Sequence, residues 1–328
     1  MTAITFEDEI SVQELPDLPG WVENYAFDAF DPKANIGYFI HMSRVAGAPH
    51  LWWEKLYIYL PDGTVGAQHN FGARPAPNGA SGAALDVVVI EPGRHLQLNY
   101  LGPVVRWSEE ELAEGHLVQR RPELISFKFD FKSGNEVWDF GKKPTDFGGH
   151  SSHIEQAGLV TGTLNFRDKS YTMDGRGYRD HSRGVRKLNE MADSAWLHGS
   201  FPSGRAFAVY AVREVHEGAV RPRSEKAVIW DNGKLYEATA HGQPYLNTTN
   251  PHNGYGGKYG IVLESEIGTM EIEADIVRTA SYTYNGANDY LVGLRAGDFD
   301  VFEEPTIFRW NGEVGVGNTE RSIRRLPY

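Results

Sequence analysis

Cysteine is absent from this sequence of 328 residues, and its absence excludes several kinds of chemistry together. Without thiols the chain cannot form disulfides, thiolate zinc sites, iron–sulfur clusters or a cysteine nucleophile. Oxygen and imidazole groups must therefore carry whatever chemistry the protein performs.

Basic residues are also in short supply. The chain has 44 acidic and 32 basic side chains, for a formal net charge of -12, and its basic residues are scattered or paired, as in Arg120-Arg121. A nucleic-acid-binding surface requires the opposite balance. We therefore expect no nucleic-acid partner.

Long apolar runs are missing as well. No segment approaches the roughly 18 uninterrupted apolar residues that a transmembrane helix needs. The first 20 residues are acidic and contain neither the basic nor the apolar region of a secretion signal. These absences predict a cytoplasmic protein without a transmembrane segment, and they leave its oligomeric state open.

The residues that are abundant favour strands broken by turns. The sequence has 36 glycines, 17 prolines and 12% aromatic residues. Apolar residues alternate with polar ones through much of residues 206–213, 261–267 and 270–277, as in strands with one buried face. Only residues 108–114, which open on a serine followed by acids, predict a short helix. The predicted class is all-β.

Turn signals separate the predicted strands. Asp62-Gly63, Asn232-Gly233 and Asn311-Gly312 each lie between apolar or aromatic segments. Strands that recur without helices between them indicate antiparallel barrels or sandwiches rather than a parallel sheet.

The length predicts about two domains. A Gly-, Lys- and Pro-containing stretch at 141–149 resembles a connector, so we predict an N-terminal barrel at 1–149 and a C-terminal barrel at 150–328, between which strands could be shared. A second Gly- and Asn-rich stretch, 247–260, predicts a long loop over a barrel mouth.

Reactive side chains are densest between His150 and Arg186. His153 and Glu155 lie two residues apart and so share one face of a predicted strand. In the run 175–186, the same alternation places Tyr178 and Asp180 on one face. Arg179 and His181 then lie on the other face of that strand.

Two interpretations of this cluster remain open. In the first, an apolar barrel interior raises the pKa of Asp180, which then donates or removes a proton, while Tyr178 and His153 orient it. In the second, the cluster is a buried structural corner in which Arg179 or Arg186 hydrogen-bonds to Asp180.

The same run carries a resemblance to a known family. Residues 175–186 (GRGYRDHSRGVR), preceded by 153–164 (HIEQAGLVTGTL), resemble the signature of proteins related to carotenoid 1,2-hydratase (hydroxyneurosporene synthase). That lipocalin-like superfamily also includes AttH-like proteins. Weaker similarity extends to residues 23–32, 36–38 and 315–322, so the resemblance spans most of the chain.

The resemblance implies two consecutive lipocalin-like antiparallel β-barrels with an apolar cavity between them. In the hydratases, the proposed chemistry is protonation of an isoprenoid double bond and capture of the cation by water. Related Diels–Alderases and tocopherol cyclases shape or protonate polyenes in similar cavities. By motif, the Tyr-x-Asp pair of the hydratases falls on Tyr178 and Asp180, and their His-x-aromatic pair falls on His153 and Glu155.

Two positions depart from the family pattern. Glu155 replaces an aromatic ring that would face a carbocation, which puts carotenoid hydration itself in question. Arg183 stands where many relatives carry tryptophan, and a cation there would suit an acidic or hydroxylated substrate.

No cofactor or metal is predicted. His150 and His153, with His181 and His198 later in the chain, are possible metal ligands. The i, i+3 spacing of the first two suits a helix, but the sequence around them predicts a strand. The glycines at 254–257 lack the strand and helix of a dinucleotide-binding motif.

The leading hypothesis is a cofactor-free acid/base enzyme acting on a hydrophobic small molecule, such as an isoprenoid or aromatic compound, by hydration or dehydration, isomerisation or cyclisation. Its predicted catalytic residues are Asp180, Tyr178, His153 and Glu155, with Glu155 able to activate water. The predicted substrate-binding residues are Trp52, Trp53, Trp196, His181 and Arg183. The alternative hypothesis is a non-catalytic lipocalin-like carrier of an apolar ligand.

Overall fold

The computed structural model describes residues 4–14, 16–18, 20–45, 47–114, 120–139, 152–185, 191–242, 257–284 and 299–324. The chain divides into two compact units, Met1–Arg106 with Gln119–Arg186, and Trp107–Val118 with Lys187–Tyr328. No helix among these described residues is long and apolar enough to cross a membrane.

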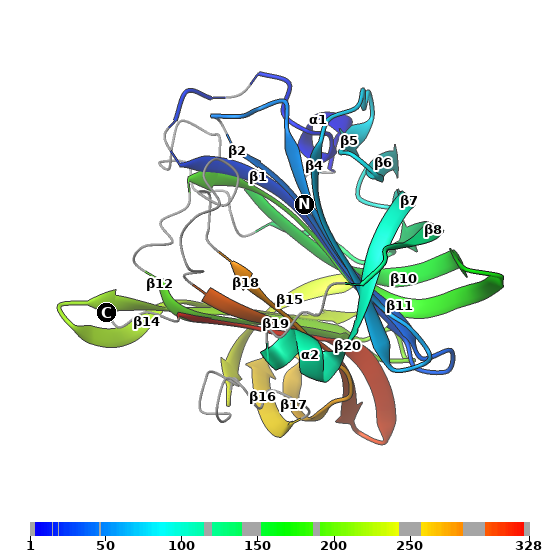
Figure 1. Ribbon diagram of the computed structural model, residues 1–328. Coiled ribbons are helices and arrows are strands. Elements are labelled where there is room, and N and C mark those ends of the chain that lie inside the picture. The colour runs from blue at the N-terminus through cyan, green and yellow to red at the C-terminus, as the bar shows by residue number, and fades with distance from the viewer. Residues whose placement is uncertain are drawn as a thin grey trace. The chain divides into compact units, whose positions relative to one another are not determined.

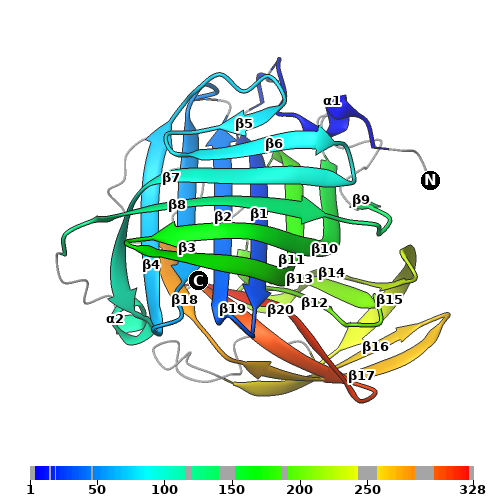
Figure 2. The ribbon, with the colours of Figure 1, turned by 90° about the vertical axis from the view of Figure 1, so that its right-hand side faces the viewer.

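The first unit is a closed antiparallel barrel. Its eight strands follow the order β4-β3-β2-β1-β11-β10-β8-β7, and β4 pairs with β7 to close the ring. In Figure 2, strands β6, β7 and β8 cross in front of β1 to β4. The elements of this unit are α1 (Phe6–Glu9), β1 (Trp21–Asp31), β2 (Ile36–Val45), β3 (Trp52–Tyr59), β4 (Thr64–Gly72), β5 (Gly79–Ser81), β6 (Leu85–Glu91), β7 (His95–Ser108), β8 (Glu123–Lys132), β9 (Trp138–Asp139), β10 (Ser152–Phe166) and β11 (Lys169–Val185).

The second unit closes in the same way. Its ring runs β17-β16-β15-β14-β13-β12-β20-β19, and β17 pairs with β19. The elements are α2 (Glu109–Glu114), β12 (Met191–Ser200), β13 (Ala206–His216), β14 (Ala219–Asp231), β15 (Lys234–His241), β16 (Lys258–Ser265), β17 (Gly268–Ile276), β18 (Ala280–Tyr284), β19 (Phe299–Trp310) and β20 (Glu313–Arg324). The predicted all-β class with two antiparallel barrels is thus confirmed.

Each barrel has its own apolar core. In the first, alternate residues of the strands point inward and form a cluster that includes Tyr25, Phe27, Tyr38, Phe129 and Val160. In the second, the cluster includes Leu197, Phe207, Ile229, Leu263 and Phe308. Alternation of this kind gives every strand a core face and an outer face.

The predicted turns are present. Asn232 and Gly233 join β14 to β15 with φ of 53° and 79°, and Asn311 and Gly312 join β19 to β20 with φ of 49° and 77°. Positive φ at both central residues is the conformation that Asn-Gly favours in two-residue hairpins. The predicted short helix is α2, and Ser108 caps it by accepting a 3.1 Å hydrogen bond from the backbone of Glu111.

The boundary between the units differs in position from the predicted one at 149/150. The hairpin of β10 and β11 pairs with β8 on one side and with β1 on the other, so residues 152–185 complete the first barrel. In Figure 1, β11 lies beside β1. The predicted connector at 141–149 lies outside the described residues, as does most of the loop predicted at 247–260.

Glycine in the 175–186 run allows β11 to approach β1 closely. A Cβ atom placed on Gly177 would lie 2.4 Å from the carbonyl oxygen of Asp28 and 2.9 Å from Cβ of Ala29. Any other residue would force the two strands apart. This glycine therefore fixes the strand that carries the next residue, Tyr178.

Candidate active site

The hairpin of β10 and β11 carries polar side chains on both faces, and apolar ones on its core face as well. On its core face, Val160 and Met173 belong to the apolar cluster of the first barrel. His153, Glu155, Tyr178 and Asp180 lie on the opposite face, because each is an odd number of residues from those core positions. One interpretation of the sequence placed Asp180 in an apolar barrel interior, whereas the structure places it, with the other three, on the outer face of the first barrel.

The structure brings all four predicted catalytic residues together. The His153 imidazole Nε2 lies 3.1 Å from Glu155 Oε1 and also contacts Asp180 Oδ2. Tyr178 donates its hydroxyl to Glu155 Oε2 at 2.7 Å. A residue that we had not predicted, Ser182, donates to Asp180 Oδ1 at 3.0 Å.

Electrostatics favour a protonated imidazole in this cluster. Burial alone would disfavour the imidazolium, but the charge and hydrogen bond of Asp180, with those of Glu155, outweigh it and raise the pKa of His153 to about 9. Burial and the nearby Glu155 raise the pKa of Tyr178 well above its usual 10. At neutral pH the cluster therefore holds two transferable protons, one on His153 and one on Tyr178.

The four residues differ in their access to solvent. The side chains of His153 and Asp180 are 12% and 10% exposed, whereas that of Glu155 is fully buried. Tyr178 is fully buried too. A substrate that approached this face would therefore meet His153 and Asp180 first.

The same residues could hold a divalent metal ion. One donor atom each from His153, Glu155 and Asp180 lies within 4.8 Å of the others. One imidazole and two carboxylates form a donor set that Zn²⁺, Fe²⁺ and Mn²⁺ accept. The hydrogen bonds described above satisfy the three side chains equally well, so a metal assay must separate the two interpretations.

Arg179 does not hold Asp180 in place, contrary to one of the two interpretations of the sequence. It lies on the core face, where it donates to Glu9 Oε1 at 2.7 Å and to Gln156 Oε1 at 3.1 Å. Its alternative, Arg186, lies outside the described residues.

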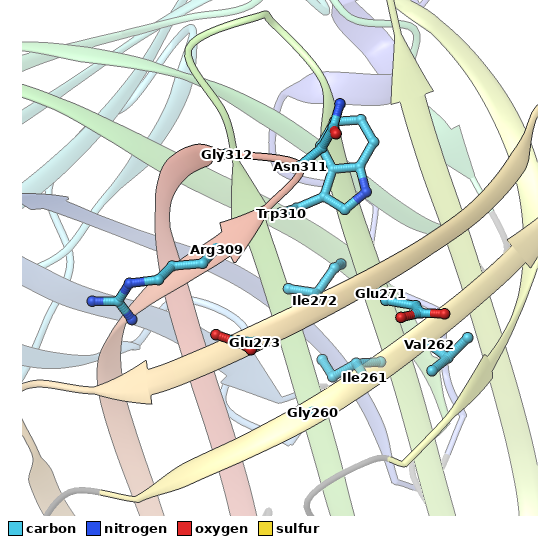
Figure 3. Close-up of a pocket in the computed structure, with 10 residues that line it drawn as sticks. All are labelled: Gly260, Ile261, Val262, Glu271, Ile272, Glu273, Arg309, Trp310, Asn311 and Gly312. Atoms are coloured by element: carbon cyan, nitrogen blue, oxygen red, sulfur yellow. The ribbon is translucent and has the colours of Figure 1, made fainter.

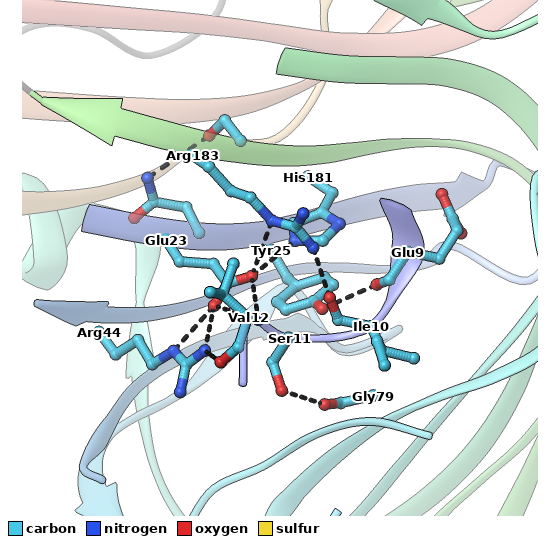
Figure 4. Close-up of polar contacts among 12 residues, drawn as sticks. Glu9, Ile10, Ser11, Val12, Glu23, Tyr25, Arg44, Gly79, His181 and Arg183 are labelled. Carbon is cyan, nitrogen blue, oxygen red and sulfur yellow. Dashed lines mark hydrogen bonds and ion pairs between the residues drawn. The ribbon is translucent and has the colours of Figure 1, made fainter. Parts of the chain in front are cut away.

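His181 and Arg183, predicted to bind substrate, also lie on the core face. Both contact Glu23 Oε1, His181 at 3.1 Å and Arg183 at 3.0 Å, and Arg44 donates to Glu23 Oε2 at 2.8 Å (Figure 4). The ring of His181 stacks on Tyr25 with centroids 3.9 Å apart. These residues form a network that we call the Glu23 network.

The charges of the Glu23 network are nearly all fixed at neutral pH. Burial would raise the pKa of Glu23, but the hydrogen bond from His181 and the charges of Arg44 and Arg183 lower it to about 2. Burial, with the charge of Arg183, lowers the pKa of His181, so its ring is neutral. The network is a set of permanent ion pairs rather than a proton store.

The N-terminal segment, residues 5–13, covers this network. Arg44 and Arg183 donate to the backbone carbonyls of Val12 and Ile10, and Tyr25 donates to that of Glu9 at 2.8 Å (Figure 4). Sequence reasoning missed this role of Glu23 and Arg44. The available signal was a charged residue at an inward position of an otherwise apolar strand.

The three predicted substrate-binding tryptophans lie in different places. Trp52 belongs to the core cluster of the first barrel, with the Arg44 guanidinium 4.8 Å from its ring centroid. Trp53, its neighbour, points to the outer face, the face that carries Asp180. Trp196 lies on β12 of the second unit, where its ring packs against His198.

The second unit holds a hollow at the end of its barrel where β17 and β19 diverge (Figure 3). It has a volume of about 430 Å³, and its lining includes Ile261, Ile272 and Trp310. Its charged lining residues, such as Glu271 and Arg309, are exposed. It therefore lacks the buried titratable groups of the β10–β11 cluster.

A buried carboxylate also lies in the second barrel. Arg321 donates to both oxygens of Glu304, at 2.8 and 2.7 Å, and both side chains are almost fully buried. Burial raises the pKa of Glu304 to about 7 although Arg321 opposes the shift. This two-point pairing with an arginine is typical of a structural ion pair.

The fold resembles that of several solved structures. A crystal structure described as AttH, from Nitrosomonas europaea, matches with a TM-score of 0.63 and 12% identity over 96% of this chain and 98% of that one. The structure of CghA with Sch210972 matches with a TM-score of 0.55 and 12% identity over 93% of this chain and 88% of that one. At such identities the likeness establishes the fold alone.

The chain belongs to the family described as "Domain of unknown function (DUF7064)", whose model matches residues 6–324. No curated protein matches the sequence.

Proposed function

We propose that this protein is a cofactor-independent acid/base enzyme of the hydratase, isomerase or cyclase type, acting on a hydrophobic small molecule. The observation that carries the proposal is the His153 imidazolium held between Asp180 and Glu155. A proton donor with a shifted pKa, paired with a carboxylate and partly accessible, is a typical catalytic arrangement.

In a hydration, the accessible pair moves the protons. His153 or Asp180 gives the proton that they share to one carbon of a double bond, whose electron pair forms the new C–H bond. Water then attacks the cation on the neighbouring carbon, and the pair takes up the proton that water releases. The net reaction adds one water, and the pair returns to its starting state.

Isomerisation and cyclisation use the same first step. After protonation, loss of a proton from a different carbon moves the double bond, whereas attack by a second double bond of the substrate closes a ring. The cluster therefore supports a class of reactions, and the shape of the substrate decides among them.

Glu155 and Tyr178 act behind this pair. The full burial of Glu155 favours orientation of the His153 ring over the activation of water that we had predicted from the sequence. Tyr178 in turn holds Glu155 through its 2.7 Å hydrogen bond. A base oriented by a third group is the general pattern of such sites.

The comparisons support a small molecule as the ligand. CghA, which shares the fold, has a structure with the small molecule Sch210972. The sequence resemblance to carotenoid hydratases adds isoprenoids, and the outer-face aromatic Trp53 is compatible with an apolar or aromatic substrate.

The test begins with extraction of the purified protein into organic solvent and mass spectrometry of any bound apolar compound. That compound and a panel of terpenoids and aromatics are then incubated in deuterated water, where turnover should place deuterium on carbon. Asp180→Asn and His153→Gln should each lower the rate by about 10²-fold or more, the usual worth of a general acid or base. Lys128→Met, an exposed change on β8, is the matched control.

The other outcomes identify the alternatives. A stoichiometric bound compound that the wild-type protein never converts would favour the carrier hypothesis. Activity lost on dialysis against a chelator, and restored by one divalent metal, would favour the metal site at His153, Glu155 and Asp180. Full activity in Asp180→Asn would refute the assignment of this residue.

A further inference from the structure

Ser182 lies beside Asp180 on the outer face of the first barrel. It is two residues further along β11, and the antiparallel register places it opposite His153 of β10 and opposite Asn24 of β1. Side chains directly opposite one another in a sheet lie on the same face. Asn24, Ser182 and His153 therefore form a row across three strands. This row is next to the one in which Asp180 lies.

Two hydrogen bonds join this row to Asp180. Ser182 donates its hydroxyl to Asp180 Oδ1 at 3.0 Å, and the side-chain amide of Asn24 donates to Ser182 Oγ at 3.4 Å. A hydroxyl has one hydrogen and two lone pairs, whereas an ionised carboxylate can only accept. Because the amide of Asn24 points an N–H toward Ser182 Oγ, the hydroxyl hydrogen is directed toward the carboxylate. Asn24 thus fixes the direction of this chain of hydrogen bonds.

The two oxygens of the Asp180 carboxylate have different contacts. Oδ1 accepts from Ser182, while Oδ2 contacts Nε2 of His153. The bond from Ser182 limits rotation of the carboxylate and keeps Oδ2 facing the imidazole. It also favours the ionised carboxylate, because a hydrogen bond donated to a charged group stabilises the charge. Ser182 is buried, so little water competes for its hydroxyl.

Glu155 is held in the same way as Asp180. Tyr178 donates its hydroxyl to Glu155 Oε2, and Glu155 Oε1 lies 3.1 Å from Nε2 of His153. Each carboxylate of the cluster therefore accepts a hydrogen bond from a hydroxyl through one oxygen and presents its other oxygen to the imidazole. A second layer of hydrogen bonds that fixes the reacting groups is typical of functional sites. Ser182 has the same position relative to Asp180 that Tyr178 has relative to Glu155.

We propose that Ser182, directed by Asn24, is a positioning residue that keeps the Asp180 carboxylate ionised and aimed at His153. This inference rests on the proposed function, in which the pair of Asp180 and His153 carries the proton, and it adds two residues that act through that pair. Removal of the Ser182 hydroxyl should therefore change the proton affinity of Asp180 and the rate of turnover. It should leave the binding of substrate unchanged.

The first test needs no substrate. The side-chain carboxyl groups of the full-length protein are titrated by carbon-13 NMR in buffer that contains a chelator, and the Asp180 signal is the one that Asp180→Asn lacks. Ser182→Ala should raise the titration midpoint of this signal by about one pH unit or more, since it removes a hydrogen bond to a charged group. Asn24→Ala leaves the hydroxyl in place but free to rotate, so it should raise the midpoint by less.

Matched variants separate positioning from a general loss of structure. Ser182→Thr keeps a hydroxyl and should keep the wild-type midpoint. Ser126→Ala on β8 is the control, because Asn165 donates to Ser126 Oγ at 3.4 Å, the same contact that Asn24 makes with Ser182. The control should leave the Asp180 midpoint where it is. An unchanged midpoint in Ser182→Ala, or an equal rise in Ser126→Ala, would overturn the proposal.

Turnover gives the second readout. With a substrate identified by deuterium incorporation, Ser182→Ala should lower kcat about 10-fold, the rate equivalent of one pH unit, and leave KM unchanged. A higher KM at constant kcat would place Ser182 in substrate binding and overturn its positioning role. If the midpoint rises but Asp180→Asn retains full activity, the proposed function fails and the role of Ser182 in holding Asp180 stands. If Asp180→Asn is inactive but the midpoint does not move, the proposed function stands and this inference fails.

Discussion

The two faces of the β10–β11 hairpin carry similar residues in different roles. On the outer face, the imidazole of His153 contacts Asp180, and burial is outweighed by the carboxylates, so its pKa rises to about 9. On the core face, His181 contacts Glu23, yet burial and Arg183 lower its pKa. A histidine beside a buried carboxylate is thus protonated on one face and neutral on the other.

The difference comes from the cations that share each carboxylate. Glu23 already has two guanidiniums, which cannot lose their protons, so it needs no charge from His181. Asp180 and Glu155 both contact the imidazolium of His153, a cation that can lose its proton. Permanent cations make the core face structural, and a removable proton makes the outer face suitable for catalysis.

Glu23→Gln should cause the largest loss of stability, because it removes the anion of the Glu23 network. The change leaves Arg44 and Arg183 buried without their anion, and removal of one partner from a buried ion pair typically costs about 3–5 kcal/mol. Urea denaturation should show this loss in the free energy of unfolding. A loss below about 1 kcal/mol would contradict the view that this network holds the barrel.

The pH dependence of stability should separate the two faces. His153 has a folded pKa of about 9 against 6.5 for the free side chain, so it contributes up to about 3 kcal/mol that is present below pH 6.5 and is lost as the pH rises through 9. Glu23 has its pKa lowered from 4.5 to about 2, so its contribution is present above pH 4.5 and is lost as the pH falls through 2.

His153→Gln provides the check. Melting curves across this range should show that the variant loses the alkaline decline and keeps the acid one. A variant whose alkaline decline equals that of the wild type would show that another group causes it.

Much of this arrangement could be predicted from local sequence. Alternation placed Tyr178 with Asp180, and His153 with Glu155, and a hairpin then brings the two pairs together because Glu155 lies opposite Asp180. Turn chemistry at Asn232 identified its hairpin, since few residues adopt its positive φ.

Alternation does not reveal which face of a strand is the core face. Both faces of β11 are polar, so His181 and Arg183 appeared to belong with Asp180 although they point to the core. The partner of Arg179 was also out of reach, because Glu9 lies 170 residues away in the sequence. The predicted domain boundary at 149/150 differs from the observed one for the same reason, since the pairing of β11 with β1 is long-range.

Arg179→Met tests how the N-terminal segment is held. The change removes the ion pair with Glu9, but Glu9 lies in a terminal segment and can turn toward water, so the cost should be about 2 kcal/mol, less than for Glu23→Gln. Hydrogen exchange should become faster in residues 5–13 and stay unchanged in β10. Unchanged exchange throughout would show that the backbone contacts of Arg44 and Arg183 suffice to hold the segment.

Asp180→Asn should have the smallest effect on stability. Its partner His153 stays paired with the Glu155 carboxylate when that of Asp180 is removed, so no unpaired charge remains buried. We expect the free energy of unfolding to change by about 1 kcal/mol or less, while the alkaline decline shifts to lower pH because the pKa of His153 falls. A loss as large as that of Glu23→Gln would mean that the outer face is a structural latch like the core face, and the contrast between a fixed and a removable proton would not hold.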